Sequence, residues 1–179
     1  MQAPLLPRWV RRIFRNEQHW DDIAFFRNVP IFYGLTSRQL ARVMLSMQRR
    51  AYRVGENLFE EGQVGKAVFV IKSGQVELLR NGPAGPRSLG VLGPGQMFGE
   101  MALLEQMQRT ATATVIEDGE IFLLYTATLE ALIRDHPDIG VKLLRNMAVL
   151  LSALLRRTNH ELDRYARELK PPSQEVANG

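Results

Sequence analysis

The residues best suited to chemistry lie close together in one stretch, FGEMALLEQMQRTATATV, which covers residues 98–115. Gly99 would let the backbone approach a ligand closely, and a helical turn that begins near Glu100 would point its free N–H groups at an anion. Arg109 would add a positive charge with forked donors that match a phosphate. Because a carboxylate repels a phosphate, Glu100 is better suited to bind a sugar hydroxyl, and Thr110 adds another donor and acceptor. The stretch therefore predicts a ligand with one phosphate and one ribose.

The composition is that of one folded globular domain, with 179 residues of which 45% are hydrophobic and 23% are charged. The sequence has no cysteine, which excludes disulfides, thiolate catalysis and sulfur-ligated metals. Its three histidines have no second ligand at metal spacing, so we expect no metal and no cofactor. It has no nucleophile elbow, no paired acids with a histidine and no phosphate-loop lysine, so we expect no catalytic residues and no enzyme.

Positive charge is concentrated at the N-terminal end. Residues 1–53 hold 10 arginines and 3 acidic residues, residues 54–125 hold 5 basic and 9 acidic residues, and residues 126–179 hold 8 and 7. Residues 1–24 contain a basic amphipathic helix, LPRWVRRIFRNEQHW, which could contact an anionic membrane or an acidic partner, or pack on its own domain. The longest apolar run, residues 147–155, is too short to cross a bilayer, and the N-terminus does not resemble a secretory signal. We therefore expect a cytoplasmic protein.

The distribution of apolar residues predicts an α+β, mainly β fold. Between residues 7 and 48 they recur at helical spacing, and Thr36 or Ser37 can cap one of the helices. Between residues 52 and 125, short runs such as AVFVIK, QVELLR, RSLGVL and EIFLLY are separated by glycine or proline turns. This spacing is typical of a small jelly-roll β-barrel. The helical pattern then returns.

The last helix is expected over residues 138–170, where two prolines end it, with a flexible tail over residues 171–179. Apolar residues recur along it in alternating steps of four and three as far as Thr158, and the alternation resumes at Leu162 after one irregular step. This seam could cover the chain's own barrel, but a helix of this length would overhang the barrel, which favours a homodimer formed through the overhang. The seam consists of Leu144, Met147, Leu151, Leu154, Thr158, Leu162, Tyr165 and Leu169.

Residues 93–115, GPGQMFGEMALLEQMQRTATATV, closely resemble the phosphate-binding cassette of the cyclic-nucleotide-binding domain family. VGENLFEEGQVGKAVFVIKSGQVEL resembles the strands that precede the cassette, FFRNVPIFYGLTSRQLARV the family's opening helices, and LEALIRDHPDIGVKLLRNM its closing helices. The resemblance extends from about residue 25 to about residue 155. It implies a cyclic-nucleotide-binding jelly-roll β-barrel over residues 25–137, flanked by N-terminal helices and the long C-terminal helix.

The resemblance also implies a role for individual residues of the cassette. Gly99 and Ala102 match positions whose backbone N–H groups bind the cyclic phosphate, and Arg109 matches the phosphate-binding arginine. Glu100 matches the acid that binds the ribose 2′-hydroxyl. Thr110 matches a position that does not by itself decide between cAMP and cGMP, and we expect cAMP. The full expected set is Gly99, Glu100, Met101, Ala102, Arg109, Thr110 and Ala111.

The purine cap is where this chain departs from the gene-regulator members of the family. In those members a polar pair on the long helix touches the adenine, whereas Leu154 and Leu155 stand at that place here. Arg156, Arg157 and Thr158 are the alternative candidates, as a stacking cation or a hydroxyl.

The resemblance implies a sensor in which the nucleotide shifts the balance between two positions of the C-terminal helix. The signal would then pass to a second copy or to an unidentified protein partner. Because about nine residues follow Lys170, we expect no helix-turn-helix and no sequence-specific DNA binding. The alternative is a degenerate scaffold domain that keeps the motif without responding to a ligand.

Overall fold

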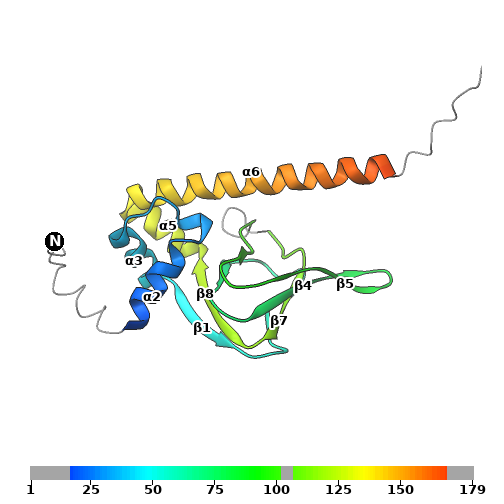
Figure 1. Cartoon of the computed structure of the whole chain (residues 1–179), viewed down its shortest axis with the longest axis horizontal. Coiled ribbons are helices and arrows are strands. Elements are labelled where there is room, and N and C mark those ends of the chain that lie inside the picture. Colours follow the sequence, from blue (N-terminus) through cyan, green and yellow to red (C-terminus); the bar gives the residue numbers. More distant parts are fainter. Residues whose placement is uncertain (1–16, 102–106, 169–179) are drawn as a thin grey trace, which may run out of the picture.

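The computed structural model describes residues 17–101 and 107–168 (Figure 1). Within these ranges, eight strands form two four-stranded antiparallel sheets. Short helices gather at one end of the sheets, and one long helix crosses above the molecule (Figure 1). The expected N-terminal basic helix and C-terminal tail fall largely outside the described residues, so the predicted division of the chain into four parts remains a prediction.

The strands alternate between the two sheets along most of the chain, as in a jelly roll. One sheet has the order β1 (Gln48–Tyr52), β8 (Gly119–Tyr125), β3 (Ala67–Ile71) and β6 (Met97–Phe98). The other has the order β2 (Asn57–Phe59), β7 (Thr112–Glu117), β4 (Gln75–Gly82) and β5 (Gly85–Leu92). The predicted jelly-roll fold is therefore confirmed, and in the described residues it consists of two separate sheets instead of one closed barrel.

Strand β3 shows how one short apolar run serves two cores. All five of its residues are buried, and neighbouring side chains point to opposite faces of the sheet. Val68 and Val70 belong to the core beneath the helices, whereas Phe69 and Ile71 belong to the core between the two sheets. Helices therefore cover the outer face of this sheet, and the second sheet covers its inner face.

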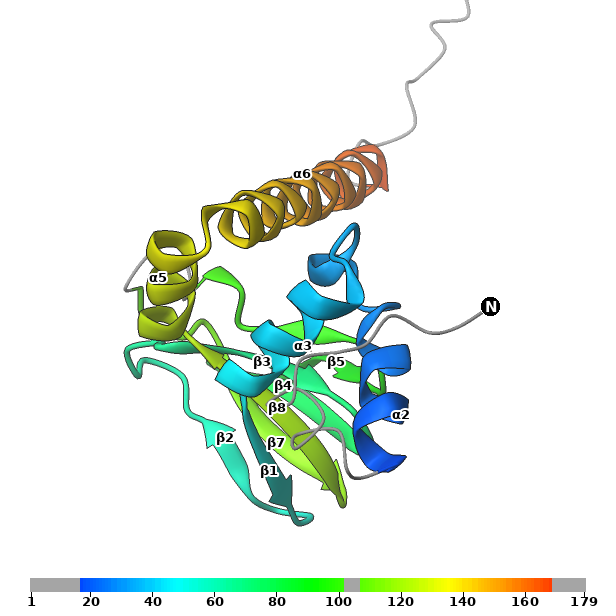
Figure 2. The ribbon, with the colours of Figure 1, turned by 90° about the vertical axis from the view of Figure 1, so that its left-hand side faces the viewer.

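The short helices are α2 (Glu17–Phe26), the 3₁₀ helix η1 (Pro30–Phe32), α3 (Ser37–Ser46) and α5 (Thr126–Asp135). Figure 2 shows α2, α3 and α5 in front of the sheets. At the start of α3, the Thr36 hydroxyl accepts from the Gln39 backbone N–H, and the Gln39 side chain accepts from the Thr36 N–H. This reciprocal cap satisfies two N–H groups that the helix leaves unpaired. Thr36 is thus the N-cap, one of the two residues predicted for it.

The long helix α6 (Pro137–Glu168) has two halves with different surroundings. Its 32 residues span about 48 Å at 1.5 Å per residue. The first half buries Ile139, Leu143 and Met147 in the core beneath the helices. Every residue from Ser152 to Glu168 is exposed. This half of α6 leads away from the short helices and lies above β4 and β5 (Figure 1). Of the predicted seam, Met147 is therefore part of the core, whereas Leu144, Leu154, Leu162 and Tyr165 are exposed.

None of the helices in the described ranges has an apolar stretch long enough to cross a membrane.

Candidate functional site

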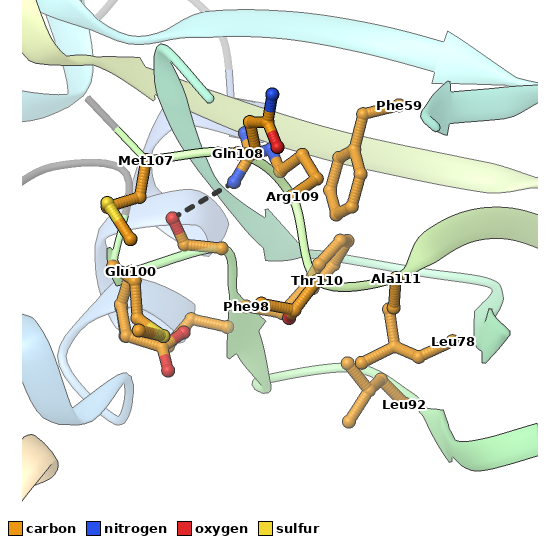
Figure 3. Close-up of a pocket in the computed structure, with 13 residues that line it drawn as sticks. Phe59, Leu78, Leu92, Phe98, Glu100, Met107, Gln108, Arg109, Thr110 and Ala111 are labelled. Carbon is orange, nitrogen blue, oxygen red and sulfur yellow. Dashed lines mark hydrogen bonds between the residues drawn. The ribbon is translucent and has the colours of Figure 1, made fainter. Parts of the chain in front are cut away.

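A cavity of about 280 Å³ lies beside the short strand β6 and the segment that leads into β7 (Figure 3). Six of the seven predicted cassette residues line it, and Ala102 falls outside the described residues. The structure therefore brings together residues that are up to twelve positions apart in the cassette. The lining residues are Phe59, Leu78, Leu92, Met97, Phe98, Gly99, Glu100, Met101, Met107, Gln108, Arg109, Thr110 and Ala111.

The backbone around Arg109 is held by the loop between β2 and β3. The Arg109 N–H donates to the carbonyl of Gln63 at 2.8 Å, and the Arg109 carbonyl accepts from the Gly62 N–H at 2.9 Å. The Gly65 N–H donates to the Met107 carbonyl at 3.1 Å. These three bonds place the Arg109 side chain on the wall of the cavity and reduce its freedom to move.

The Arg109 side chain is 9% exposed and is held by uncharged groups. Its Nη2 donates to the Ala67 carbonyl at 2.7 Å, and its Nη1 donates to the Gly99 carbonyl at 3.2 Å. The guanidinium carbon lies 4.1 Å from the centre of the Phe59 ring and 5.5 Å from that of Phe69. Figure 3 shows the guanidinium beside Phe59, with the bond to Gly99 as a dashed line.

Arg109 has no ion-pair partner within the described part of the chain. None of the described carboxylates forms an ion pair with it. Burial lowers the pKa of the Arg109 guanidinium below its ordinary value, and the charge of Glu100 opposes this shift. An arginine still remains protonated at neutral pH. A desolvated cation at the wall of a cavity is a strong attractor for an anion.

Gly99 occupies a position that no other residue fits without strain. Its φ of +76° lies in the left-handed region. A Cβ at this position would lie 2.6 Å from Nη1 of Arg109 and 3.4 Å from the Ala67 carbonyl oxygen. The missing side chain of Gly99 therefore makes room for the guanidinium, a reason that adds to the close ligand approach expected from the sequence.

The rest of the lining divides into a polar and an apolar part. Glu100 is half-buried at the cavity, and Thr110 is exposed beside Arg109. The Thr110 carbonyl accepts from Nε of Arg80 at 2.9 Å, which fixes the backbone and leaves the hydroxyl of Thr110 available. Leu78 and Leu92, from β4 and β5, supply an apolar wall. Such a mixture suits a ligand with a flat apolar part and a charged polar part.

The candidate purine-cap residues do not line the cavity. Arg156, Arg157 and Thr158 lie on the exposed half of α6, where each bonds to its own helix. Arg156 donates to Ser152, Arg157 pairs with Glu161, and the Thr158 hydroxyl donates to the Leu154 carbonyl. Their role as a cap stays a prediction.

Several lining residues have no counterpart among the predicted ones. These are Phe59, Leu78, Leu92, Met97, Phe98, Met107 and Gln108. Four of them, Phe59, Leu78, Leu92 and Phe98, come from strands and are of residue types that are common in any strand. Nothing in the sequence therefore marks these four for a binding role.

A family model described as the cyclic nucleotide-binding domain matches residues 49–136. This range contains every residue that lines the cavity.

Known proteins share both the sequence and the fold. The Cyclic AMP receptor protein of Thermus thermophilus is 38% identical over 135 residues, which cover 75% of this chain and 61% of that relative. This chain thus spans about three fifths of the length of that curated relative. The N-terminal domain of a transcriptional regulator from Streptomyces coelicolor has a TM-score of 0.65 at 31% identity, covering 74% of this chain and 91% of that one. A cyclic nucleotide-binding-like protein from Brucella abortus has a TM-score of 0.57 at 30% identity, covering 64% and 98%.

Proposed function

This chain belongs to the cyclic nucleotide-binding domain family, and from that premise we propose that it is a sensor that binds a cyclic nucleotide in the cavity beside Arg109. The observation that carries the proposal is the buried guanidinium of Arg109, which lines the cavity and forms no ion pair with any described carboxylate. The anionic phosphate of a cyclic nucleotide supplies the missing charge through charge-assisted hydrogen bonds.

The proposed binding mode assigns each polar group of the ligand to a part of the cassette. Arg109 and the backbone N–H groups of Gly99 and Ala102 hold the cyclic phosphate. Glu100 accepts a hydrogen bond from the ribose 2′-hydroxyl, and the Thr110 hydroxyl bonds to the phosphate or the base. The apolar wall that includes Leu78 and Leu92 packs against the purine.

The proposed ligand is cAMP in preference to cGMP. The relative from Thermus thermophilus carries cAMP in its name. An exposed Thr110 hydroxyl is compatible with both bases, so the preference depends on this likeness and not on the cavity.

The proposed output is the long helix α6. Its half from Ser152 to Glu168 is exposed throughout and carries Leu154, Leu155, Leu162 and Tyr165. Exposed apolar side chains on a helix half that buries none of its residues favour pairing with a second copy. The nucleotide would bias the position of this helix and so signal through a homodimer, or to a protein partner, without sequence-specific DNA binding or catalysis by this chain.

Isothermal titration with cAMP and, separately, cGMP tests the proposal. The protein is first unfolded, dialysed free of carried-over nucleotide and refolded, and its molar mass is measured by light scattering with and without ligand. We expect micromolar or tighter binding, tighter for cAMP, and the mass of a dimer. If neither nucleotide binds, the sensor proposal is wrong, and the alternative, a scaffold domain that does not respond to a ligand, takes its place.

A further inference from the structure

Phe59 contacts the proposed phosphate-binding group, since the guanidinium carbon of Arg109 lies over its ring. We infer that Phe59 is a positioning residue of the site: its ring holds the Arg109 guanidinium in place while leaving the positive charge free for an anion. The contact is a property of this chain, and only its effect on ligand affinity rests on the proposed function.

The Arg109 guanidinium makes two kinds of contact, hydrogen bonds through its N–H groups and a contact with an aromatic ring. A guanidinium is planar and carries five N–H donors at its edges. Two of them donate to the carbonyls of Ala67 and Gly99, so three remain for a ligand. The guanidinium carbon lies over the Phe59 ring, 4.1 Å from the ring centre. The ring therefore restrains the arginine without occupying any of its donors.

The chemistry of the restraint also matters. A carboxylate at this place would hold the arginine at least as firmly, but it would neutralise the charge on which anion binding depends. The face of an aromatic ring attracts a cation through its quadrupole and carries no net charge. This attraction is stronger when the pair is shielded from water, as it is for a cation that is 9% exposed.

The Phe59 ring is itself fixed by neighbouring rings and by its strand. It lies 5.4 Å from Phe69 and 6.0 Å from Phe98, centre to centre, and those two rings stack 5.2 Å apart with planes 13° apart. The pairing of β2 with β7 is irregular between Asn57 and Phe59. Such bulges redirect a side chain that regular pairing would place elsewhere. Phe59 is thus a rigid platform at the cavity wall.

The test replaces the aromatic face while keeping an apolar side chain. Phe59→Leu removes the ring, and Phe59→Tyr restores it. Phe25→Leu is the matched control, because Phe25 is also half-buried and contacts another ring, Phe26, but packs on the core beneath the helices. We expect Phe59→Leu to weaken cAMP binding about tenfold, and Phe59→Tyr and Phe25→Leu to change it less than about twofold. Equal affinity of Phe59→Leu and the wild type would overturn the inference while leaving the proposed function intact.

Fluorinated phenylalanines at position 59 separate the charge attraction from packing. Successive fluorine atoms weaken the ring quadrupole while changing the shape of the ring little. We expect cAMP affinity to fall stepwise from one to three fluorines. A flat series would mean that the ring acts by packing alone, and the inference would be wrong.

A nitrogen-15 NMR spectrum tests the contact between Phe59 and Arg109 without any ligand. The Nε–H signal of Arg109, identified by its loss in Arg109→Lys, should lie at an unusual proton shift because it sits over a ring. That displacement should vanish in Phe59→Leu and persist in Phe25→Leu. If it persists in Phe59→Leu, the inference fails; if the protein binds neither nucleotide but the displacement depends on Phe59, the proposed function fails and the positioning contact stands.

Discussion

Two charged side chains, Asp22 and Arg109, are buried in the described part of this chain, and they differ in whether an opposite charge pairs with them. Asp22, on α2, is 3% exposed, and it accepts from Nη1 of Arg49 at 3.3 Å and from Nζ of Lys72. Arg49 also binds Glu120 on β8, with bonds of 3.0 and 2.6 Å. Asp22 is therefore the centre of an ion-pair network that ties α2 to the first sheet.

Arg109 is buried to a similar degree but has only neutral partners. Two carbonyls and an aromatic ring hold its side chain, and no described carboxylate pairs with it. A buried charge that is compensated within the fold contributes to the structure, whereas a buried charge that is not compensated has a cost that an incoming ion can remove. Under the proposed function, Asp22 therefore serves the fold and Arg109 serves the ligand, and the two residues should respond differently to substitution.

Substitution of Arg109 should give the largest effect on binding. Arg109→Leu removes the charge and its donors, and we expect cAMP affinity to fall by about a hundredfold or more. Loss of the buried charge favours the fold, whereas loss of the bonds to the Ala67 and Gly99 carbonyls opposes it, so the free energy of unfolding should change by less than about 1 kcal/mol. Titration calorimetry and denaturant unfolding measure the two effects. Arg50→Leu, which removes an exposed arginine stacked on Tyr52, is the control and should bind normally.

Substitution of Asp22 should show the reverse pattern. Asp22→Asn keeps the shape of the side chain but removes the charge that Arg49 and Lys72 share, and we expect a loss of about 2 kcal/mol in the free energy of unfolding. Affinity for cAMP should stay within about twofold of the wild type. Asp21→Asn changes an exposed neighbour and should be neutral. A large loss of affinity in Asp22→Asn would remove the distinction between the two charges.

Gly99→Ala tests the space that the arginine needs. The added Cβ would lie 2.6 Å from Nη1 of Arg109, so the guanidinium must shift, and we expect about tenfold weaker binding. Gly95→Ala is the matched control, because Gly95 also has a positive φ, +83°, but a Cβ added there would meet no atom within 4 Å. Both variants should lose about 1 kcal/mol of stability from backbone strain. If both bind cAMP equally well, the close approach at Gly99 has no role in the site.

Asp138 gives the smallest expected effect, since it is a fully exposed charge at the start of α6. A hydrogen bond from the Gln39 side chain, 2.6 Å long, is the main cause that lowers the pKa of Asp138 below its ordinary 3.8. A lowered pKa contributes stability at neutral pH that is lost as the pH falls through the pKa of the folded state. Gln39→Met should therefore reduce stability slightly more at neutral pH than below that pKa, because the lost cap on Thr36 costs the same at both pH values and only the bond to Asp138 depends on pH, as measured by acid unfolding. An unchanged Asp138 carboxyl titration by NMR would contradict this.

The sequence predicts the fold well where the signal is local. The Thr36 cap, the short apolar strands and the glycine at position 99 depend on neighbours within a few residues, and all of them appear in the structure. The Asp22–Lys72 contact joins residues 50 positions apart, so no local pattern reveals it. Phe59 looks like any aromatic strand residue in the sequence, and only the packing shows that it faces a cation.

The long helix shows a second limit of prediction from sequence. Its apolar seam continues with nearly the same period through Met147 and Leu162, but Met147 is buried and Leu162 is exposed. The period of the apolar residues predicts which face of the helix they share. It does not predict how far along the helix the rest of the domain covers that face. The same lack of long-range information leaves the purine cap undecided, because Arg156 and its neighbours lie on the exposed half.

The most direct test of the central claim is to titrate the nucleotide-free wild-type protein with cAMP and with adenosine, which keeps the base and ribose but lacks the phosphate. If the charge of Arg109 is reserved for the phosphate, cAMP binds at micromolar concentration or tighter and adenosine binds at least about a hundredfold more weakly. Equal binding of the two ligands would contradict the claim, because the cavity would then recognise the nucleoside without using its buried cation.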